Sequence, residues 1–172
     1  MRRTLTTAAT ALLLAGLAAC SNNSTPSSSD SGAPNKPAAA STPLTASTTF
    51  TKLSATVTAA KLSGVVTAEN DGNHLLGRPG QYTSKVTFTD SRVPASDVAG
   101  SAKGDVNWGG AIEVFGSGTD AQTRAKYIGA VTKSMPALAE YDYVHGTVLV
   151  RVSHYLTPAQ AQQYKTAVEG IG

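Results

Sequence analysis

The clearest alternation of side chains lies at 148–152, where three valines alternate with Leu149 and Arg151. Successive side chains of a strand point to opposite faces of the sheet, so this pattern predicts a strand. Gly146 marks a turn before it, and residues 141–145 are therefore the expected hairpin partner. Three further strands are expected earlier in the chain, at 62–67, 84–89 and 112–114.

Two other segments repeat apolar residues at helical spacing. Residues 50–57 predict a short first helix, through Phe50, Leu53 and Val57. A second helix is expected after Thr119 and Asp120, which can cap and charge its start, and Pro136 stops it. Its apolar stripe would comprise Ala121, Ala125, Ile128, Thr132 and Met135.

The C-terminal segment carries the strongest signal for the start of a helix. Thr157 can serve as the N-cap, Pro158 suits the first helical position, and Gln160 completes a capping box. The buried stripe of this helix would comprise Ala161, Tyr164, Val168 and Ile171.

These elements predict an α+β fold. Alternating strands have one apolar face and the helices have one apolar stripe each, so a single sheet with helices on one side buries both. We therefore expect a two-layer sandwich with an antiparallel or mixed sheet and helices on one face, of which the ferredoxin-like fold is an example. An open polar face of the sheet would then carry Lys85, Thr87, Thr89, Glu113 and Arg151.

A short apolar run near the N-terminus ends at the only cysteine of the chain. Arg2 and Arg3 precede apolar and small residues at 12–19, and Cys20 follows. Because a membrane helix takes about 20 residues, this run predicts a cleaved leader. The stretch Leu17-Ala18-Ala19-Cys20 resembles the lipobox of bacterial lipoproteins.

The lipobox resemblance implies that the chain is cut before Cys20 and that the Cys20 thiol carries a diacylglycerol. The protein would then be anchored by lipid to the extracytoplasmic face of the cell membrane. The alternatives are an ordinary signal peptide cleaved nearby, or a cysteine placed there by chance. Arg2 and Arg3 leave twin-arginine export open beside general secretion, which we take as the expected route.

Composition divides the remaining chain into a tether and a domain. Residues 20–49 are mostly Ser, Thr, Ala, Pro and Asn, which predicts a lipidated cysteine followed by a disordered tether. Residues 50–172 form the single expected extracytoplasmic domain, and residues 1–19 the leader. Without the leader, 12 basic residues face 11 acidic ones, and no clustered basic face predicts a nucleic-acid partner.

Three stretches of the domain resemble small lipoproteins of the actinobacterial envelope. They are 73–85 (NHLLGRPGQYTSK), 110–115 (GAIEVF) and 141–146 (YDYVHG), and the resemblance extends over much of 69–157. It implies an extracytoplasmic location and a similar fold, and it implies no particular activity.

The turn Gly77-Arg78-Pro79-Gly80 is the most unusual local feature of the domain. Such a turn can present Arg78, Tyr82 and Lys85 to an anionic ligand such as a phosphate or carboxylate. The alternative is a structural loop in which Arg78 binds a nearby carboxylate or carbonyl group. Trp108 can stack on a ligand ring or cover the core.

The sequence contains no motif that assigns catalysis. His74, His145 and His154 are scattered, and no nucleophile elbow, phosphate loop or dinucleotide fingerprint is present. We therefore assign no catalytic residue, metal or cofactor. The expected role is non-catalytic, either binding or structural, and its partner would be an envelope protein, the cell wall or a small anionic ligand. One alternative is an envelope hydrolase that uses carboxylates such as Asp90, Asp105, Glu113 and Glu140. Another is an immunity or inhibitor protein that acts on an envelope partner.

Overall fold

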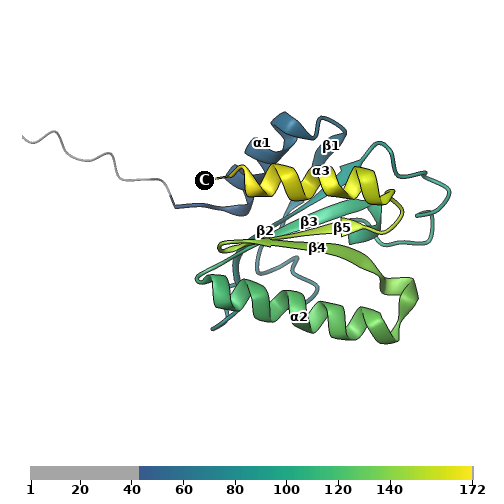
Figure 1. The fold of residues 1–172 in the computed structure, drawn as a ribbon. Coiled ribbons are helices and arrows are strands. Elements are labelled where there is room, and N and C mark those ends of the chain that lie inside the picture. Colours follow the sequence, from purple (N-terminus) through teal and green to yellow (C-terminus); the bar gives the residue numbers. More distant parts are fainter. Residues whose placement is uncertain (1–42, 172) are drawn as a thin grey trace, which may run out of the picture. The chain divides into compact units, whose positions relative to one another are not determined.

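The computed structural model describes residues 43–171, which form one sheet with three α-helices (Figure 1). The predicted leader, Cys20 and residues 21–42 of the predicted tether lie outside the described residues. Within residues 43–171, no helix is both long and apolar enough to cross a membrane.

The sheet has five strands in the order β1-β2-β3-β5-β4, and every neighbouring pair is antiparallel. The strands are β1 (Ala60–Val65), β2 (Tyr82–Asp90), β3 (Gly109–Phe115), β4 (Glu140–His145) and β5 (Val148–Ser153). Each strand that the sequence predicts is confirmed to within a few residues. The expected hairpin of β4 and β5 is also confirmed, with Gly146 at φ 54° in its turn.

Helices α1 (Ala46–Thr56) and α3 (Pro158–Glu169) cover one face of the sheet. The larger core lies beneath them and takes alternate residues of the strands, among them Val86, Ile112 and Val150. The sheet and these two helices form the predicted α+β sandwich. The order of elements, which starts and ends with a helix, differs from the β-α-β-β-α-β order of a ferredoxin-like fold.

Helix α2 (Gly118–Ser134) lies against the opposite face of the sheet (Figure 1). The expectation that all helices share one face therefore does not hold for α2. The physical reason is a second set of apolar side chains on that face, including Phe115 and Leu149, which pack with Ile128 of α2 in a smaller core cluster. Leu149 stands between the valines of β5, and burying it requires a cover on the other face.

The structure confirms one of the predicted helix N-caps and corrects another. The capping box of Thr157 and Gln160 is confirmed. Helix α2 is capped by Ser117, whose hydroxyl accepts the backbone N–H of Asp120 at 3.1 Å, which corrects the expected cap at Thr119. Met135, expected on the apolar stripe of α2, is 46% exposed just beyond its end.

Helix α1 begins before the domain boundary expected from composition. Helix α1 starts at Ala46, whereas the domain was expected to start at Phe50. The backbone N–H of Ala46 donates to Ser84 Oγ of β2 at 2.9 Å, and the Ala46 side chain is fully buried. Contacts with β2 therefore bring residues of low apolar content into the fold.

A candidate binding site between helix α2 and the sheet

A buried group of charged side chains lies at the centre of the face that α2 covers. Glu113 of β3 is fully buried, and three cations surround its carboxylate. Lys85 Nζ lies 3.1 Å from Oε1, Arg124 Nε 3.2 Å from Oε2, and Arg151 Nη1 3.3 Å from Oε1. We call Glu113, Lys85, Arg124 and Arg151 the charge cluster.

The pairing of strands places these residues together. Lys85 and Glu113 are direct partners in the β2–β3 register, and Arg151 of β5 is opposite Ala111 of β3 on the same face. The sequence correctly predicts that Lys85, Glu113 and Arg151 share a face. The prediction that this face is open is wrong, because Lys85 is 8% exposed and Glu113 is not exposed at all.

The cations keep Glu113 ionised. Burial alone raises the pKa of Glu113, but Lys85, Arg151 and Arg124 together outweigh it and hold the pKa below its usual range. A carboxylate held in this form carries no proton to donate near neutral pH.

Arg151 extends the charge cluster to β4. Its Nε and Nη2 each donate to Glu140 at 2.9 Å, which is the two-point geometry of a strong arginine–carboxylate pair. Asp142 is the register partner of Arg151, and its Oδ1 is buried without a hydrogen bond. Burial and the negative charge of Glu140 raise the pKa of Asp142 to about 7, although Arg151 opposes the rise.

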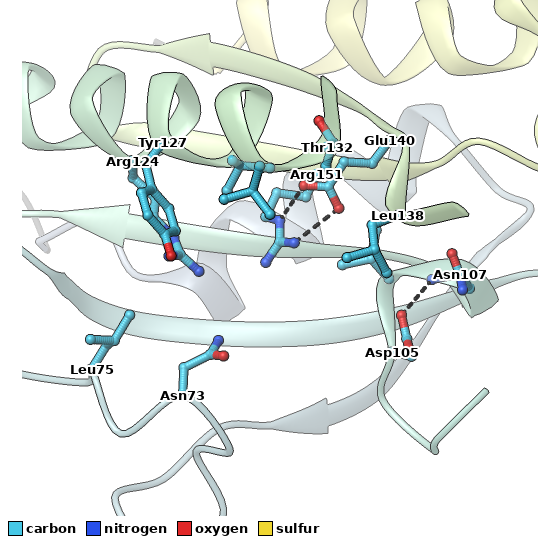
Figure 2. Close-up of a pocket in the computed structure, with 13 residues that line it drawn as sticks. Asn73, Leu75, Asp105, Asn107, Arg124, Tyr127, Thr132, Leu138, Glu140 and Arg151 are labelled. Carbon is cyan, nitrogen blue, oxygen red and sulfur yellow. Dashed lines mark hydrogen bonds and ion pairs between the residues drawn. The ribbon is translucent and has the colours of Figure 1, made fainter. Parts of the chain in front are cut away.

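A cavity of about 410 Å³ lies between α2 and this face of the sheet, within the ~300–1,000 Å³ typical of small-molecule sites. Figure 2 shows the guanidinium groups of Arg124 and Arg151 directed into it, with Asn73 and Leu75 on the opposite wall. Its lining residues are Asn73, Leu75, Asp105, Val106, Asn107, Arg124, Tyr127, Ile128, Val131, Thr132, Leu138, Glu140 and Arg151. We call it the α2 cavity.

A second cavity, of about 610 Å³, lies toward β1. It is lined by Lys85, Thr87 and residues of β1, and also by Lys103 and Gly104. Asn73 and Asp105 line both cavities, so the connections 66–81 and 91–105 pass between them.

The connection 66–81 is held in place by one buried carboxylate. Both oxygens of Asp71 lie 2.7 Å from the Tyr82 hydroxyl, which donates to the carboxylate, and Oδ2 accepts the backbone N–H groups of Leu75 and Leu76 at 2.8 and 2.9 Å. Burial opposes ionisation of Asp71, but these donors outweigh it and lower the pKa to about 2. Asp71 thereby fixes the wall of the α2 cavity that carries Asn73 and Leu75.

The four contact residues expected from the sequence do not share one cavity. Arg78 is exposed in the expected turn, with Gly77 and Gly80 at φ 75° and 70°. Tyr82 is fully buried and holds Asp71, while Lys85 lies above its ring, 5.0 Å from the centroid. Trp108 packs against the larger core, and its indole N–H donates to the Ser101 carbonyl at 3.4 Å.

Arg124 and Tyr127 of α2 are site residues that were not predicted from the sequence. Arg124 lies three residues after Ala121 and four before Ile128, so its helical position is on the buried face of α2. The sequence signal that could have identified Arg124 is its position on the apolar stripe of a helix. A buried cation requires an anionic partner, so such an arginine indicates a buried charged site.

Comparisons with known proteins return nothing: no family model matches the chain, and no curated protein or solved structure matches it. Within residues 43–171, no three His, Cys, Asp or Glu side chains gather in a way that could hold a metal ion. The α2 cavity and the charge cluster beside it are the structural features that can bind a ligand.

Proposed function

We propose that this chain is an envelope lipoprotein, anchored by Cys20 to the extracytoplasmic face of the cell membrane, whose domain binds a small molecule in the α2 cavity without transforming it. The observation that carries the binding role is the α2 cavity itself, with two arginines in a wall that is otherwise partly apolar. The anchor rests on the lipobox resemblance of residues 17–20 and on the composition of the tether.

The carboxylates near the cavity favour binding over hydrolysis. A glycosidase-type site needs a carboxylic acid that can protonate a leaving group. Glu113 is held ionised, and Asp142, whose pKa is raised to about 7, is not among the residues that line the α2 cavity. Glu140 lines the cavity, but both of its oxygens accept from Arg151. Asp105 also lines the cavity, and its Oδ1 accepts the backbone N–H of Asn107 at 3.1 Å.

The anchor predicts that Cys20→Ala releases the protein from membranes. Each methylene of a buried acyl chain contributes about 0.8 kcal/mol, and the variant has no sulfur to accept a diacylglycerol. Fractionation of cells that express the full chain should therefore move the protein from the membrane pellet to the soluble envelope fraction. Ser21→Ala, one residue further on, is the matched control and should stay in the pellet. A Cys20→Ala protein that still sediments with membranes contradicts the anchor.

The binding role predicts that small probes bind in the α2 cavity. We would titrate the full-length protein in detergent with hexanoate, 1-hexanol, glucose and inorganic phosphate and follow backbone amide shifts by NMR. At least one probe should shift residues that line the cavity, such as Asn73 and Ile128, in a saturable manner.

A bulky side chain in the cavity provides the control. Thr132→Trp fills the α2 cavity and should abolish the binding, whereas Thr123→Trp, exposed on the same helix, should not. Absence of saturable shifts with every probe, or binding that survives Thr132→Trp, would contradict the binding role of this cavity.

A further inference from the structure

The hydrogen bonds of the charge cluster leave one arginine with free donors. Arg124 uses its Nε to bind Glu113, and its terminal nitrogens make no hydrogen bond to other described residues. Arg151, by contrast, uses Nε and both terminal nitrogens on Glu140 and Glu113. The Arg124 side chain is 11% exposed, and Figure 2 shows it directed into the cavity.

Arg124 is held in a fixed orientation. Its Nε–Glu113 bond anchors one edge of the guanidinium, and its Cζ lies over the ring of Tyr127, 5.8 Å from the ring centroid. A guanidinium fixed in this way presents its remaining donors as a rigid fork, which matches the two oxygens of a carboxylate.

The charges around the α2 cavity favour a ligand with a single negative charge. Arg151 is paired with Glu140 and shares Glu113 with Lys85. Asp105 adds a further carboxylate at the rim, so the cavity has no excess of cations to balance a dianion such as phosphate. A monoanion at Arg124 meets one cation with free donors, and Asp105 and Glu140 repel it less strongly than they would repel a dianion.

Part of the cavity wall is apolar. Leu75, Val106, Ile128, Val131 and Leu138 line it, and Leu138 is 50% exposed. A ligand with an apolar body would remove part of this surface from water, which a bare anion does not do.

We propose that the α2 cavity binds small monocarboxylates with a compact apolar body, whose carboxylate accepts two hydrogen bonds from the terminal nitrogens of Arg124. This inference rests on the proposed binding function and adds the chemical class of the ligand. The apolar body lies against Ile128, Val131 and Leu138.

The test separates the charge of the ligand from its body. In the NMR titration of the full-length protein, hexanoate has both features, acetate has the charge alone and 1-hexanol has the body alone. Inorganic phosphate, titrated above its second pKa, is the dianion. Hexanoate should bind at least about tenfold more tightly than each of the others, because a charge-assisted bidentate pair and burial of the chain both contribute. Equal or tighter binding of 1-hexanol or phosphate overturns the proposal.

Variants of Arg124 complete the test. Arg124→Gln should weaken hexanoate binding about tenfold or more and leave 1-hexanol unchanged, while Lys126→Gln, exposed on the same helix, should bind hexanoate as the parent does. Arg124→Lys keeps a cation beside Glu113 but loses the fork, so it should fold and still bind hexanoate several-fold more weakly. Should the glutamine variant fail to fold, the lysine variant decides: hexanoate binding equal to that of the parent overturns the proposal.

Failure of this inference is distinguishable from failure of the binding function. If 1-hexanol or glucose binds in the cavity and Thr132→Trp abolishes that binding, while hexanoate has no advantage, the α2 cavity is a binding site of another ligand class. If no probe binds there, both proposals fail.

Discussion

Glu113→Gln is expected to lower the free energy of unfolding by about 3–5 kcal/mol, because removing one partner of a buried ion pair leaves an uncompensated charge in the interior. Three cations share this carboxylate, and the side chains of Lys85, Arg124 and Arg151 are 9%, 11% and 15% exposed. Glutamine has nearly the same shape but no charge, so the effect isolates electrostatics from packing. Urea unfolding followed by circular dichroism measures it.

Two further variants test the assignment of this loss to charge. Glu169→Gln removes the exposed partner of Lys165 in α3, where the pair is 3.9 Å apart, and should cost less than about 0.5 kcal/mol. Lys85→Met in the Glu113→Gln background removes one of the unbalanced cations and should recover part of the loss. A Glu113→Gln protein within about 1 kcal/mol of the parent would show that the charge cluster is not a buried ion network.

The same loss should depend on pH in a defined direction. The pKa of Glu113 is lower in the folded protein than in the unfolded chain. Its contribution is therefore fully present above the unfolded value, about 4.3, and disappears as the pH falls through the folded-state value. At acidic pH the protonated glutamic acid resembles glutamine, so the stabilities of the parent and Glu113→Gln should converge there.

Most of the fold could be predicted from the sequence because the sequence signals for its strands, turns and helix caps are local. The valine alternation of β5, the turn at Gly146 and the capping box at Thr157 each act over a few residues, and each is confirmed. The start of α1 could not be predicted from such local signals. Its position depends on the contact between Ala46 and Ser84, which are far apart in the chain, whereas composition alone assigns residues 46–49 to the tether.

The candidate site could be predicted only in part from the sequence, because its formation also depends on contacts between distant segments. The alternation along β2, β3 and β5 places Lys85, Glu113 and Arg151 on one face, and this part is correct. Whether that face is open depends on which side α2 packs. The deciding residues are Phe115, Leu149 and Ile128, whose contacts join three separate elements. Arg124 becomes a site residue only through that packing, so the sequence directed attention to Arg78, which is exposed in its turn.

Gly110→Ala is expected to destabilise the domain by about 3 kcal/mol or more, at the upper end of the usual cost of overpacking a core. A Cβ at Gly110 of β3 would overlap the Arg151 carbonyl oxygen and the ring of Phe88, the direct partner of Gly110 in β2. The ring cannot move away easily, because it stacks on Tyr164 at 5.3 Å and packs against Phe50 at 5.9 Å between ring centroids. Because Gly110 has no side chain, the Phe88 ring can pack beside it and contact Phe50 of α1 and Tyr164 of α3.

A glycine in open space provides the matched control for this prediction. Gly129 lies inside α2, and nothing lies within 4 Å of an added Cβ. Gly129→Ala should therefore raise the free energy of unfolding by about 0.5–1 kcal/mol through helix propensity. Phe88→Leu in the Gly110→Ala background removes the overlap with the ring but not that with the Arg151 carbonyl, so it should restore little stability. Urea unfolding compares both glycine variants with the parent. A Gly110→Ala protein as stable as the parent would contradict the close packing of β3 against Phe88 and β5. That result would require space for a Cβ that this arrangement of strands does not contain.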